Sequence, residues 1–321
     1  MNLFLCSTPL QLKIAARIIE VEALANVTVL FTGIMPNRRN EFYLQQLERL
    51  ADEIVYFNKN VCLEKSRSAY LNQQARAVID KYALQNAKSI YLANLNDRFY
   101  HHLLSLLPGR AIYTYDDGTE NVNQLSKFFR NKQYSWFRKR VQRHFGRKFW
   151  LEEVLASTQC HYTIYEHLPN VVKNTRFIPL YAPKFTTEIP NKTINILLGT
   201  VYRDVVQDRN NTAMLIADIN SYVKAHEMDL YIPHPREETL HFDNCQALIP
   251  EQMSEEIIMG YLEQGYKAHL YGFGGSTQLN LDSVVGVTNY LFESPLISER
   301  VRNGYQLFYG HVEFLKLPNG K

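Results

Sequence analysis

Residues 111–118 have the sequence AIYTYDDG, in which an apolar run ends in two adjacent carboxylates and a glycine. A second stretch of this kind, MDLYIPHPR at residues 228–236, ends with an imidazole between two prolines. The apolar runs, 111–115 and 228–232, are typical of buried strands. Because open α/β sheets bind ligands at the carboxyl ends of their strands, both motifs are expected at a ligand-binding edge. A carboxylate and a histidine placed there are suited to serve as base and acid in one group transfer.

Short apolar segments alternate with helical patterns along the first half of the chain, which predicts parallel βαβ units. The expected strands cover residues 3–6, 27–31, 54–57, 89–93 and 111–115, and the expected helices include 41–51 and 66–84. The proline-bearing segment 178–192 resembles an interdomain linker, and a new alternation begins at 194–199. We therefore predict an α/β protein with two Rossmann-like domains, 1–185 and 186–321, facing a central cleft. The segment after Val301 is expected to cross back to the first domain.

The composition is that of an ordinary soluble globular protein. Of the 321 residues, 46% are hydrophobic and 21% are charged, and the net charge of +3 is too small to indicate nucleic-acid binding by itself. The four cysteines are scattered without a CxxC pair, which argues against a structural zinc site and a disulfide framework. A signal peptide and a run of about 18 apolar residues are both missing. We therefore expect a cytoplasmic protein that is soluble, or attached to a membrane only at its surface.

The pair Asp116-Asp117 is suited to general base catalysis. One carboxylate can take a proton from an attacking hydroxyl, and crowding two carboxylates tends to raise the pKa of one of them. The alternative is a simple turn, because Asp-Gly is a common turn dipeptide. The motif lacks the DxD spacing often used for nucleotide-bound metals.

His234 has an unusual setting, since prolines on both sides restrict the backbone that carries it. A protonated imidazole there can hydrogen-bond a phosphate or protonate a leaving group. The alternative is a histidine that is satisfied within a rigid turn. Arg236, just beyond, is placed to clamp a phosphate, and its alternative is a solvated charge.

The loop GFGGST, residues 272–277, follows a predicted strand and opens a predicted helix. Glycines let the backbone approach an anion, and a helix N-terminus offers N–H groups together with the hydroxyls of Ser276 and Thr277. The motif is neither a Walker A sequence nor a clear GxGxxG. A phosphate site and an ordinary N-cap after a tight turn both fit these residues.

The stretch 127–150 is basic and aromatic, with nine Lys and Arg residues and no acidic residue. This combination suits an anionic membrane surface or a phosphorylated glycolipid. Nucleic acid is a further possible partner. The alternative is a pair of solvated helices that use their aromatic residues for the core.

Four motifs taken together resemble those of bacterial lipooligosaccharide sialyltransferases: CSTPLQL (6–12), YDDG (115–118), PHPRE (233–237) and GGST (274–277). The resemblance covers most of the chain. It implies a GT-B fold and a metal-independent, inverting enzyme of lipopolysaccharide biosynthesis that needs no cofactor. Such an enzyme moves sialic acid from CMP-sialic acid to a terminal galactose, usually in an α-2,3 linkage. It also implies an N-terminal acceptor domain and a C-terminal nucleotide-sugar domain.

The resemblance implies a role for particular residues. Asp117 is the expected base and Asp116 the second choice, with Asp204 and Asp208 as rivals. His234, Ser276 and Thr277 are expected to hold the CMP phosphate and help it leave. The other expected nucleotide contacts are Gly199, Thr200, Pro235, Arg236 and Gly275. Thr8 and Gln11 are candidates for the acceptor side, with helix capping and a solvated first turn as the alternative.

Two other functions stay open at this point. One is a glucosyltransferase of the same family that uses a nucleotide-glucose donor. The other is a non-catalytic protein that binds glycans or nucleic acid through residues 127–150; the ordered motif set favours an enzyme that does not bind nucleic acid. Members of the family are often peripheral to the membrane and some form dimers by exchanging segments, so both properties are expectations for this chain.

Overall fold

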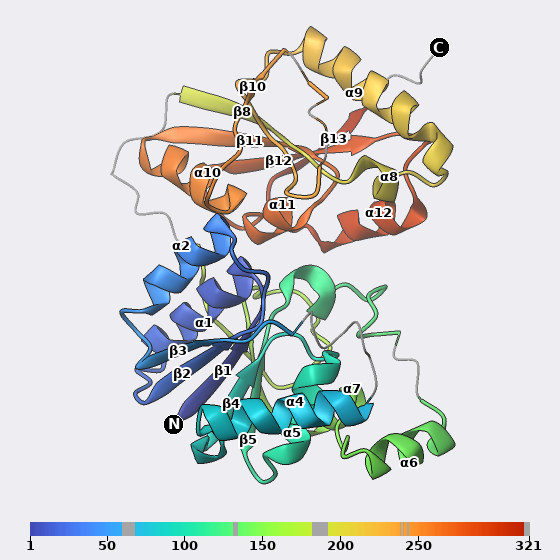
Figure 1. The fold of residues 1–321 in the computed structure, drawn as a ribbon. Helices are drawn as coiled ribbons and strands as arrows, with labels where there is room; N and C mark the ends of the chain where they lie inside the picture. The colour runs from blue at the N-terminus through green and yellow to red at the C-terminus, as the bar shows by residue number, and fades with distance from the viewer. Residues whose placement is uncertain are drawn as a thin grey trace. The chain divides into compact units, whose positions relative to one another are not determined.

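The computed structural model describes residues 1–59, 68–130, 134–181, 192–237, 239, 241–242 and 244–317. The chain divides into two compact units, Met1–Leu180 and Tyr181–Lys321 (Figure 1). The boundary expected between residues 185 and 186 falls in the segment 182–191, outside the described residues.

The first unit contains a seven-stranded parallel sheet with the strand order β3-β2-β1-β4-β5-β6-β7. The direction of winding reverses between β1 and β4, which makes this the switch point of a Rossmann-like sheet. The strands are β1 (Asn2–Cys6), β2 (Val27–Phe31), β3 (Glu53–Tyr56), β4 (Ser89–Leu92), β5 (Ala111–Tyr115), β6 (Thr158–Thr163) and β7 (Thr175–Phe177). The helices are α1 (Pro9–Val21), α2 (Arg38–Leu47), α4 (Ser68–Lys81), α5 (Arg98–Leu106), α6 (Trp136–His144) and α7 (Leu151–Ser157). The five strands predicted for this half are confirmed within one or two residues.

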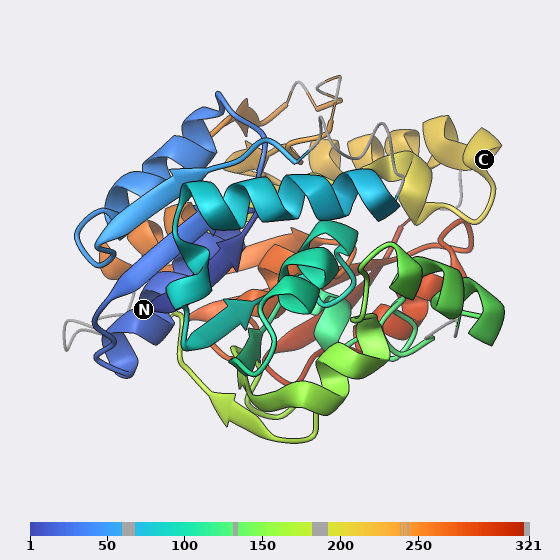
Figure 2. The same ribbon diagram turned by 60° about the horizontal axis from the view of Figure 1, so that its bottom comes forward.

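The central strands of this sheet are largely apolar and largely buried. Every residue of β2 is buried, and α4, α5 and α7 share one hydrophobic core with a face of the sheet (Figure 2). Continuous burial of this kind is typical of parallel sheets. The pair Asp116-Asp117 follows directly after the carboxyl end of β5.

The second unit repeats this architecture with a six-stranded parallel sheet in the order β10-β9-β8-β11-β12-β13. Along β8 and β11, alternate side chains enter two cores, one shared with α10 and the other with α9. The strands are β8 (Lys192–Leu198), β9 (Leu230–Ile232), β10 (Gln246–Ala247), β11 (Tyr266–Gly272), β12 (Val287–Glu293) and β13 (Val312–Lys316). The helices are α8 (Tyr202–Val205), α9 (Thr212–Ala225), α10 (Ser254–Glu263), α11 (Ser276–Asn280) and α12 (Glu299–Gly304).

The expectation that the segment after Val301 crosses back to the first domain is wrong. Val301 lies in α12, and the chain continues into β13, which pairs with β12 from Asn289↔Val312 to Glu293↔Lys316. The backbone groups of β12 need a partner on that side, and β13 supplies it. The described chain up to Leu317 therefore belongs to the second unit.

Candidate active site

The two adjacent aspartates after β5 have different surroundings. Asp116 is fully buried, and its carboxylate accepts four hydrogen bonds. The donors are His161 Nε2 at 2.9 Å, Thr163 Oγ1 at 2.8 Å, the Ile164 backbone N–H at 2.7 Å and Asn170 Nδ2 at 3.3 Å. A carboxylate with both oxygens occupied in this way ties the end of β5 to β6 and to the chain that follows it.

Asp117 is half-buried, and its Oδ1 accepts a hydrogen bond from Gln11 Nε2 at 2.7 Å. Its backbone N–H donates to Asn121 Oδ1 at 2.8 Å, which fixes the main chain. Within the described ranges, no residue donates to the other carboxylate oxygen, Oδ2. Burial raises the pKa of Asp117 above its ordinary value, and the Gln11 hydrogen bond opposes this rise. A carboxylate is suited to accept a proton when its pKa is raised and one of its oxygens receives no hydrogen bond from the described residues.

The turn expected for Asp-Gly is also present. Gly118 has a φ of +61°, a conformation that glycine adopts without strain, and it begins a short 3₁₀ helix, Gly118–Asn121. A turn at Asp-Gly is therefore compatible with a role of Asp117 as a base. The two aspartates that precede the turn have different surroundings. Thr8 caps α1, its Oγ1 accepting the Gln11 backbone N–H at 3.3 Å, so the capping interpretation holds for Thr8.

The loop after β9 holds His234 by two backbone hydrogen bonds. The His234 N–H donates to Glu237 Oε2 at 3.0 Å, and the Arg236 N–H donates to His234 Nδ1 at 3.1 Å. Because Nδ1 accepts a hydrogen bond, the neutral ring carries its proton on Nε2. Tyr231 donates its hydroxyl to Glu237 Oε1, and burial raises the pKa of Glu237. Glu237 thus holds the loop that carries His234.

Gly199, at the end of β8, lets this loop approach closely. Its N–H donates to Ile232 O at 2.8 Å. A Cβ added at Gly199 would lie 2.7 Å from the His234 backbone nitrogen and 2.8 Å from Pro233 Cα, distances that side-chain carbons do not tolerate. The glycine is therefore required for packing, whatever its role toward a ligand.

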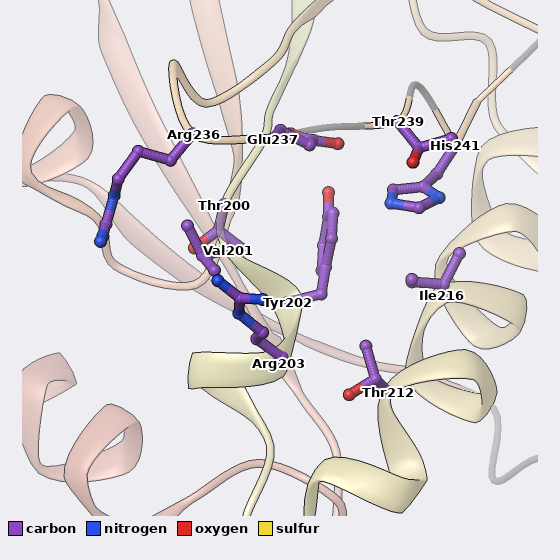
Figure 3. Close-up of a pocket in the computed structure, with 10 residues that line it drawn as sticks. All are labelled: Thr200, Val201, Tyr202, Arg203, Thr212, Ile216, Arg236, Glu237, Thr239 and His241. Atoms are coloured by element: carbon purple, nitrogen blue, oxygen red, sulfur yellow. The ribbon is translucent and has the colours of Figure 1, made fainter.

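Next to this loop, the second unit has a cavity of about 170 Å³ (Figure 3). It lies between the chain after β8, the start of α9 and the chain after β9. Thr200 and Glu237 line it, Arg203 and Arg236 bring two guanidinium groups to it, and His241 brings an imidazole. The side chain of Tyr202 points across it, with Arg203 and Arg236 on one side and His241 on the other (Figure 3). Such a lining favours an anionic ligand.

The GGST loop follows β11. Gly274 has a φ of +66°, and its N–H donates at 2.9 Å to Oε1 of Gln278, a buried side chain that also bonds to Leu270 O. Gly275 is the N-cap of α11, so Ser276 is the first helical residue and does not cap the helix. Ser276 is exposed and Thr277 is half-buried. Both hydroxyls therefore remain candidates for ligand contact.

Sheet order brings the three motifs of the second unit together. Strands β9, β8 and β11 are neighbours and parallel, so Pro233–Arg236, Gly199–Thr200 and Gly274–Thr277 follow adjacent carboxyl ends. The rival aspartates lie in the same unit, beyond Thr200. Asp204 is exposed in α8, whereas Asp208 accepts the Asn210 N–H at 3.0 Å as the cap of a short 3₁₀ helix.

Several residues around the site were not predicted from the sequence. His161 and Thr163 carry no local signal, because their partner Asp116 is 45 or more positions away in the chain. The role of Glu237, the last residue of the PHPRE motif, was not predicted either. Its spacing of three residues after His234 is that of a capping box and is a signal that identifies the pair.

Over the described ranges, which omit 60–67, 131–133, 182–191 and a few later positions, no cluster of three or more His, Cys, Asp or Glu side chains is arranged to hold a metal ion. In the same part of the chain, every helix is too short or too polar to cross a membrane. Cys6, Cys160 and Cys245, the cysteines in the part of the chain that the structure describes, are not joined by disulfide bonds.

Two parallel α/β units of this kind define the GT-B class of glycosyltransferase folds. The chain is similar to the solved structure of the glycotransferase of kitacinnamycin, with a TM-score of 0.53 and 10% identity over 98% of this chain and 86% of the other. It is also similar to a UDP-N-acetylglucosamine 2-epimerase, with a TM-score of 0.50 and 12% identity over 96% and 86%. At this level of identity, these similarities concern the fold alone.

The model of glycosyltransferase family 52 matches residues 25–293, and the chain belongs to this family. It is 28% identical to a CMP-N-acetylneuraminate:beta-galactoside alpha-2,3-sialyltransferase of Pasteurella multocida, over 88% of this chain and 87% of the relative. It is 24% identical to an N-acetyllactosaminide alpha-2,3-sialyltransferase of Neisseria meningitidis, over 93% and 80%. The resemblance to bacterial sialyltransferases, the GT-B fold and the assignment as a glycosyltransferase are confirmed.

Proposed function

We propose that this chain transfers sialic acid from CMP-sialic acid to a terminal galactose of a lipooligosaccharide or related glycan, with inversion and in an α-2,3 linkage. The names of the family relatives support the donor, the galactoside and the linkage. The observation that carries the proposal is the meeting of the His234 loop, Gly199–Thr200 and the GGST loop at adjacent strand ends of the second unit.

The second unit is then the nucleotide-sugar domain, from about residue 186, and the first is the acceptor domain. The CMP phosphate gains negative charge as it leaves, and fixed donors directed at such a charge are usually the largest catalytic effect. His234 Nε2–H and the hydroxyls of Ser276 and Thr277 supply these donors. Gly199, Thr200, Pro235, Arg236 and Gly275 contribute backbone groups and one guanidinium. These donors make a metal unnecessary, so activity should persist in a chelator.

Asp117 is the proposed base, which takes the proton of the galactose hydroxyl as that oxygen attacks the anomeric carbon. Asp116 is unsuited to this role because four donors already occupy its carboxylate. Asp208 is engaged as a cap. Asp204 is exposed on the unit that carries His234, so it is the rival that an experiment has to test.

The function is tested by offering the purified protein CMP-sialic acid and UDP-glucose separately, each with a galactose-terminated acceptor and with EDTA. We expect release of CMP and a sialylated product whose linkage is cleaved by an α-2,3-specific sialidase. Turnover of UDP-glucose alone would replace the proposal with the glucosyltransferase. Salt-sensitive binding to RNA or DNA without turnover of either donor would identify a binding protein instead.

A matched pair of variants examines the proposed donor site in the same assay. His234→Ala removes the Nε2–H donor and should lower kcat by roughly 10²- to 10³-fold. His226→Ala, which alters an exposed histidine at the end of α9, should leave turnover unchanged. Equal activity of the two variants would contradict the role of His234.

Helix α6 supports peripheral attachment to an anionic membrane. None of its residues is buried, and Trp136 and Phe137 are 68% and 69% exposed. The guanidinium of Arg140 lies over the Trp136 ring at 5.3 Å, so aromatic and cationic groups share this surface. Exposed aromatics among cations are typical of helices that lie in the headgroup region. Phe128 and Trp150, by contrast, are core residues. In the stretch 127–150, the use of aromatic residues for the core therefore applies to these two, and the proposed membrane contact to α6.

Vesicle flotation tests this attachment. We expect the protein to float with phosphatidylserine-containing vesicles at low salt and to be released at high salt, because the attraction is largely electrostatic. A double substitution, Trp136→Ser with Phe137→Ser, should reduce flotation. Ile249→Ser, at an exposed apolar residue of the second unit, is the control and should have no effect. Equal flotation with neutral vesicles would contradict the proposal.

Dimerisation of this chain stays a prediction.

A further inference from the structure

Two arginines line the cavity beside the His234 loop. Arg203 and Arg236 reach it from α8 and from the chain after β9, and they lie on the same side of it (Figure 3). Both side chains are exposed, and neither forms an ion pair with a carboxylate of the described residues. Glu237 lines the same cavity, but its two oxygens already accept the Tyr231 hydroxyl and the His234 N–H. Two guanidinium groups that are not neutralised beside one cavity attract an anion.

The segment that carries Arg203 is fixed in place. Tyr202 and Val205 of α8 are buried in the core of the second unit, whereas Arg203, between them in the chain, is exposed. At the end of this helix, the Ser298 N–H donates to Val205 O at 2.9 Å. Because the backbone is already held, only the side chain of Arg203 has to become ordered when a ligand binds.

The cavity has the size of one chemical group of a ligand rather than of a whole nucleotide sugar. Its volume is about 170 Å³. Pockets that enclose a small-molecule ligand usually measure about 300–1,000 Å³. A carboxylate needs much less room, and the planar guanidinium of an arginine matches it with two parallel hydrogen bonds. The cavity is therefore suited to one anionic group of a larger ligand.

CMP-sialic acid has two anionic groups attached to one carbon atom. The anomeric carbon of its sugar is bonded both to the carboxylate and to an oxygen of the phosphate. A residue that binds the carboxylate must therefore lie beside the residues that bind the phosphate. Arg203 meets this condition, because β8, which precedes α8, lies between β9 and β11, the strands that the His234 loop and the GGST loop follow. UDP-glucose has no carboxylate, so a contact with this group distinguishes the two donors.

We infer that Arg203 binds the carboxylate of the donor sugar and so selects sialic acid over neutral sugars, while Arg236, in the loop of His234, contacts the phosphate. Arg203 has this role only if the donor is CMP-sialic acid, so the inference rests on the proposed function. The role concerns the donor alone and is independent of which carboxylate of the chain serves as the base.

The test compares CMP-sialic acid with CMP, which has the phosphate but lacks the carboxylate. Arg203→Met removes the guanidinium and keeps an unbranched side chain. We expect kcat/KM for CMP-sialic acid to fall by about 10- to 100-fold, the usual effect of a lost hydrogen bond to a charged group. The Kd of CMP, measured by calorimetry, should stay unchanged, which also shows that the variant is folded. Arg203→Lys should give a smaller loss, because an ammonium group keeps the charge but cannot form the two parallel hydrogen bonds.

Arg209→Met is the matched control. Arg209 is an exposed arginine of the same unit, in the short 3₁₀ helix Arg209–Asn211, and it does not line the cavity. This variant should change neither kcat/KM nor the Kd of CMP. A rise in the Kd of CMP as large as the fall in kcat/KM of Arg203→Met would overturn the inference, because the guanidinium would then bind the nucleotide. An unchanged kcat/KM would overturn it as well. The proposed function fails separately, if the wild-type protein does not turn over CMP-sialic acid.

Discussion

Asp117→Asn should reduce sialyl transfer by roughly 10²- to 10⁴-fold, the usual cost of removing a general base. Asparagine has nearly the same shape and can still accept the Gln11 hydrogen bond through its side-chain oxygen. What it loses is the capacity to take a proton. Binding of CMP-sialic acid should persist, because the proposed donor contacts belong to other residues.

The same substitution should make the protein more stable at neutral pH. Burial raises the pKa of Asp117 in the folded protein above that in the unfolded chain. Between those two pKa values the folded state binds more protons, so stability falls as the pH rises through this window. At neutral pH the ionised carboxylate therefore lowers the free energy of unfolding, and a neutral asparagine removes that cost. Loss of activity with a gain in stability is typical of a functional site.

Thermal unfolding at several pH values, measured beside steady-state rates, tests both effects. The melting temperature of Asp117→Asn should exceed that of the wild type at pH 7, and the difference should shrink as the pH is lowered. Asp204→Asn provides the decisive comparison for the base. Near-normal transfer by Asp117→Asn together with an inactive Asp204→Asn would move the base to α8.

Asp116→Asn, one position away, should act in the opposite way and strongly destabilise the protein. An amide can accept at only one end, so its NH₂ group would face either Thr163 and the Ile164 N–H or His161 and Asn170. Two buried donors would then lose their acceptor, at about 1–3 kcal/mol each. A loss of this size is a large share of the 5–15 kcal/mol typical of a folded domain.

Urea denaturation of the two aspartate variants, run side by side, measures this contrast. The unfolding midpoint of Asp116→Asn should fall well below that of the wild type, and that of Asp117→Asn should not. A midpoint unchanged by Asp116→Asn would mean that the four hydrogen bonds contribute little, and the assignment of Asp116 to structure would fail. Activity of the folded fraction of Asp116→Asn should remain, since the proposed base is intact.

Local sequence predicted the framework of this site well. The strands that precede the DDG, PHP and GGST motifs are recognisable because an apolar run bounded by glycine or proline reflects burial on both faces of a parallel sheet. Because each motif directly follows its apolar run, its position beyond the end of a strand could be predicted as well. The prediction that the segment after Val301 crosses back to the first domain was wrong. That segment forms β13, and a short, partly exposed edge strand of this kind has no strong apolar pattern.

The sequence by itself determined that two α/β halves carry a carboxylate pair, a proline-flanked histidine and a glycine-serine loop at the carboxyl ends of strands. This follows from short-range patterns, which are local consequences of burial. Only the tertiary structure decided what surrounds each of the two carboxylates. Asp116 is occupied by donors 45 or more positions away, and Asp117 is held by a glutamine 106 positions away. Such hydrogen bonds exist only once β1, β5 and β6 lie in one sheet, so no local pattern distinguishes the two residues.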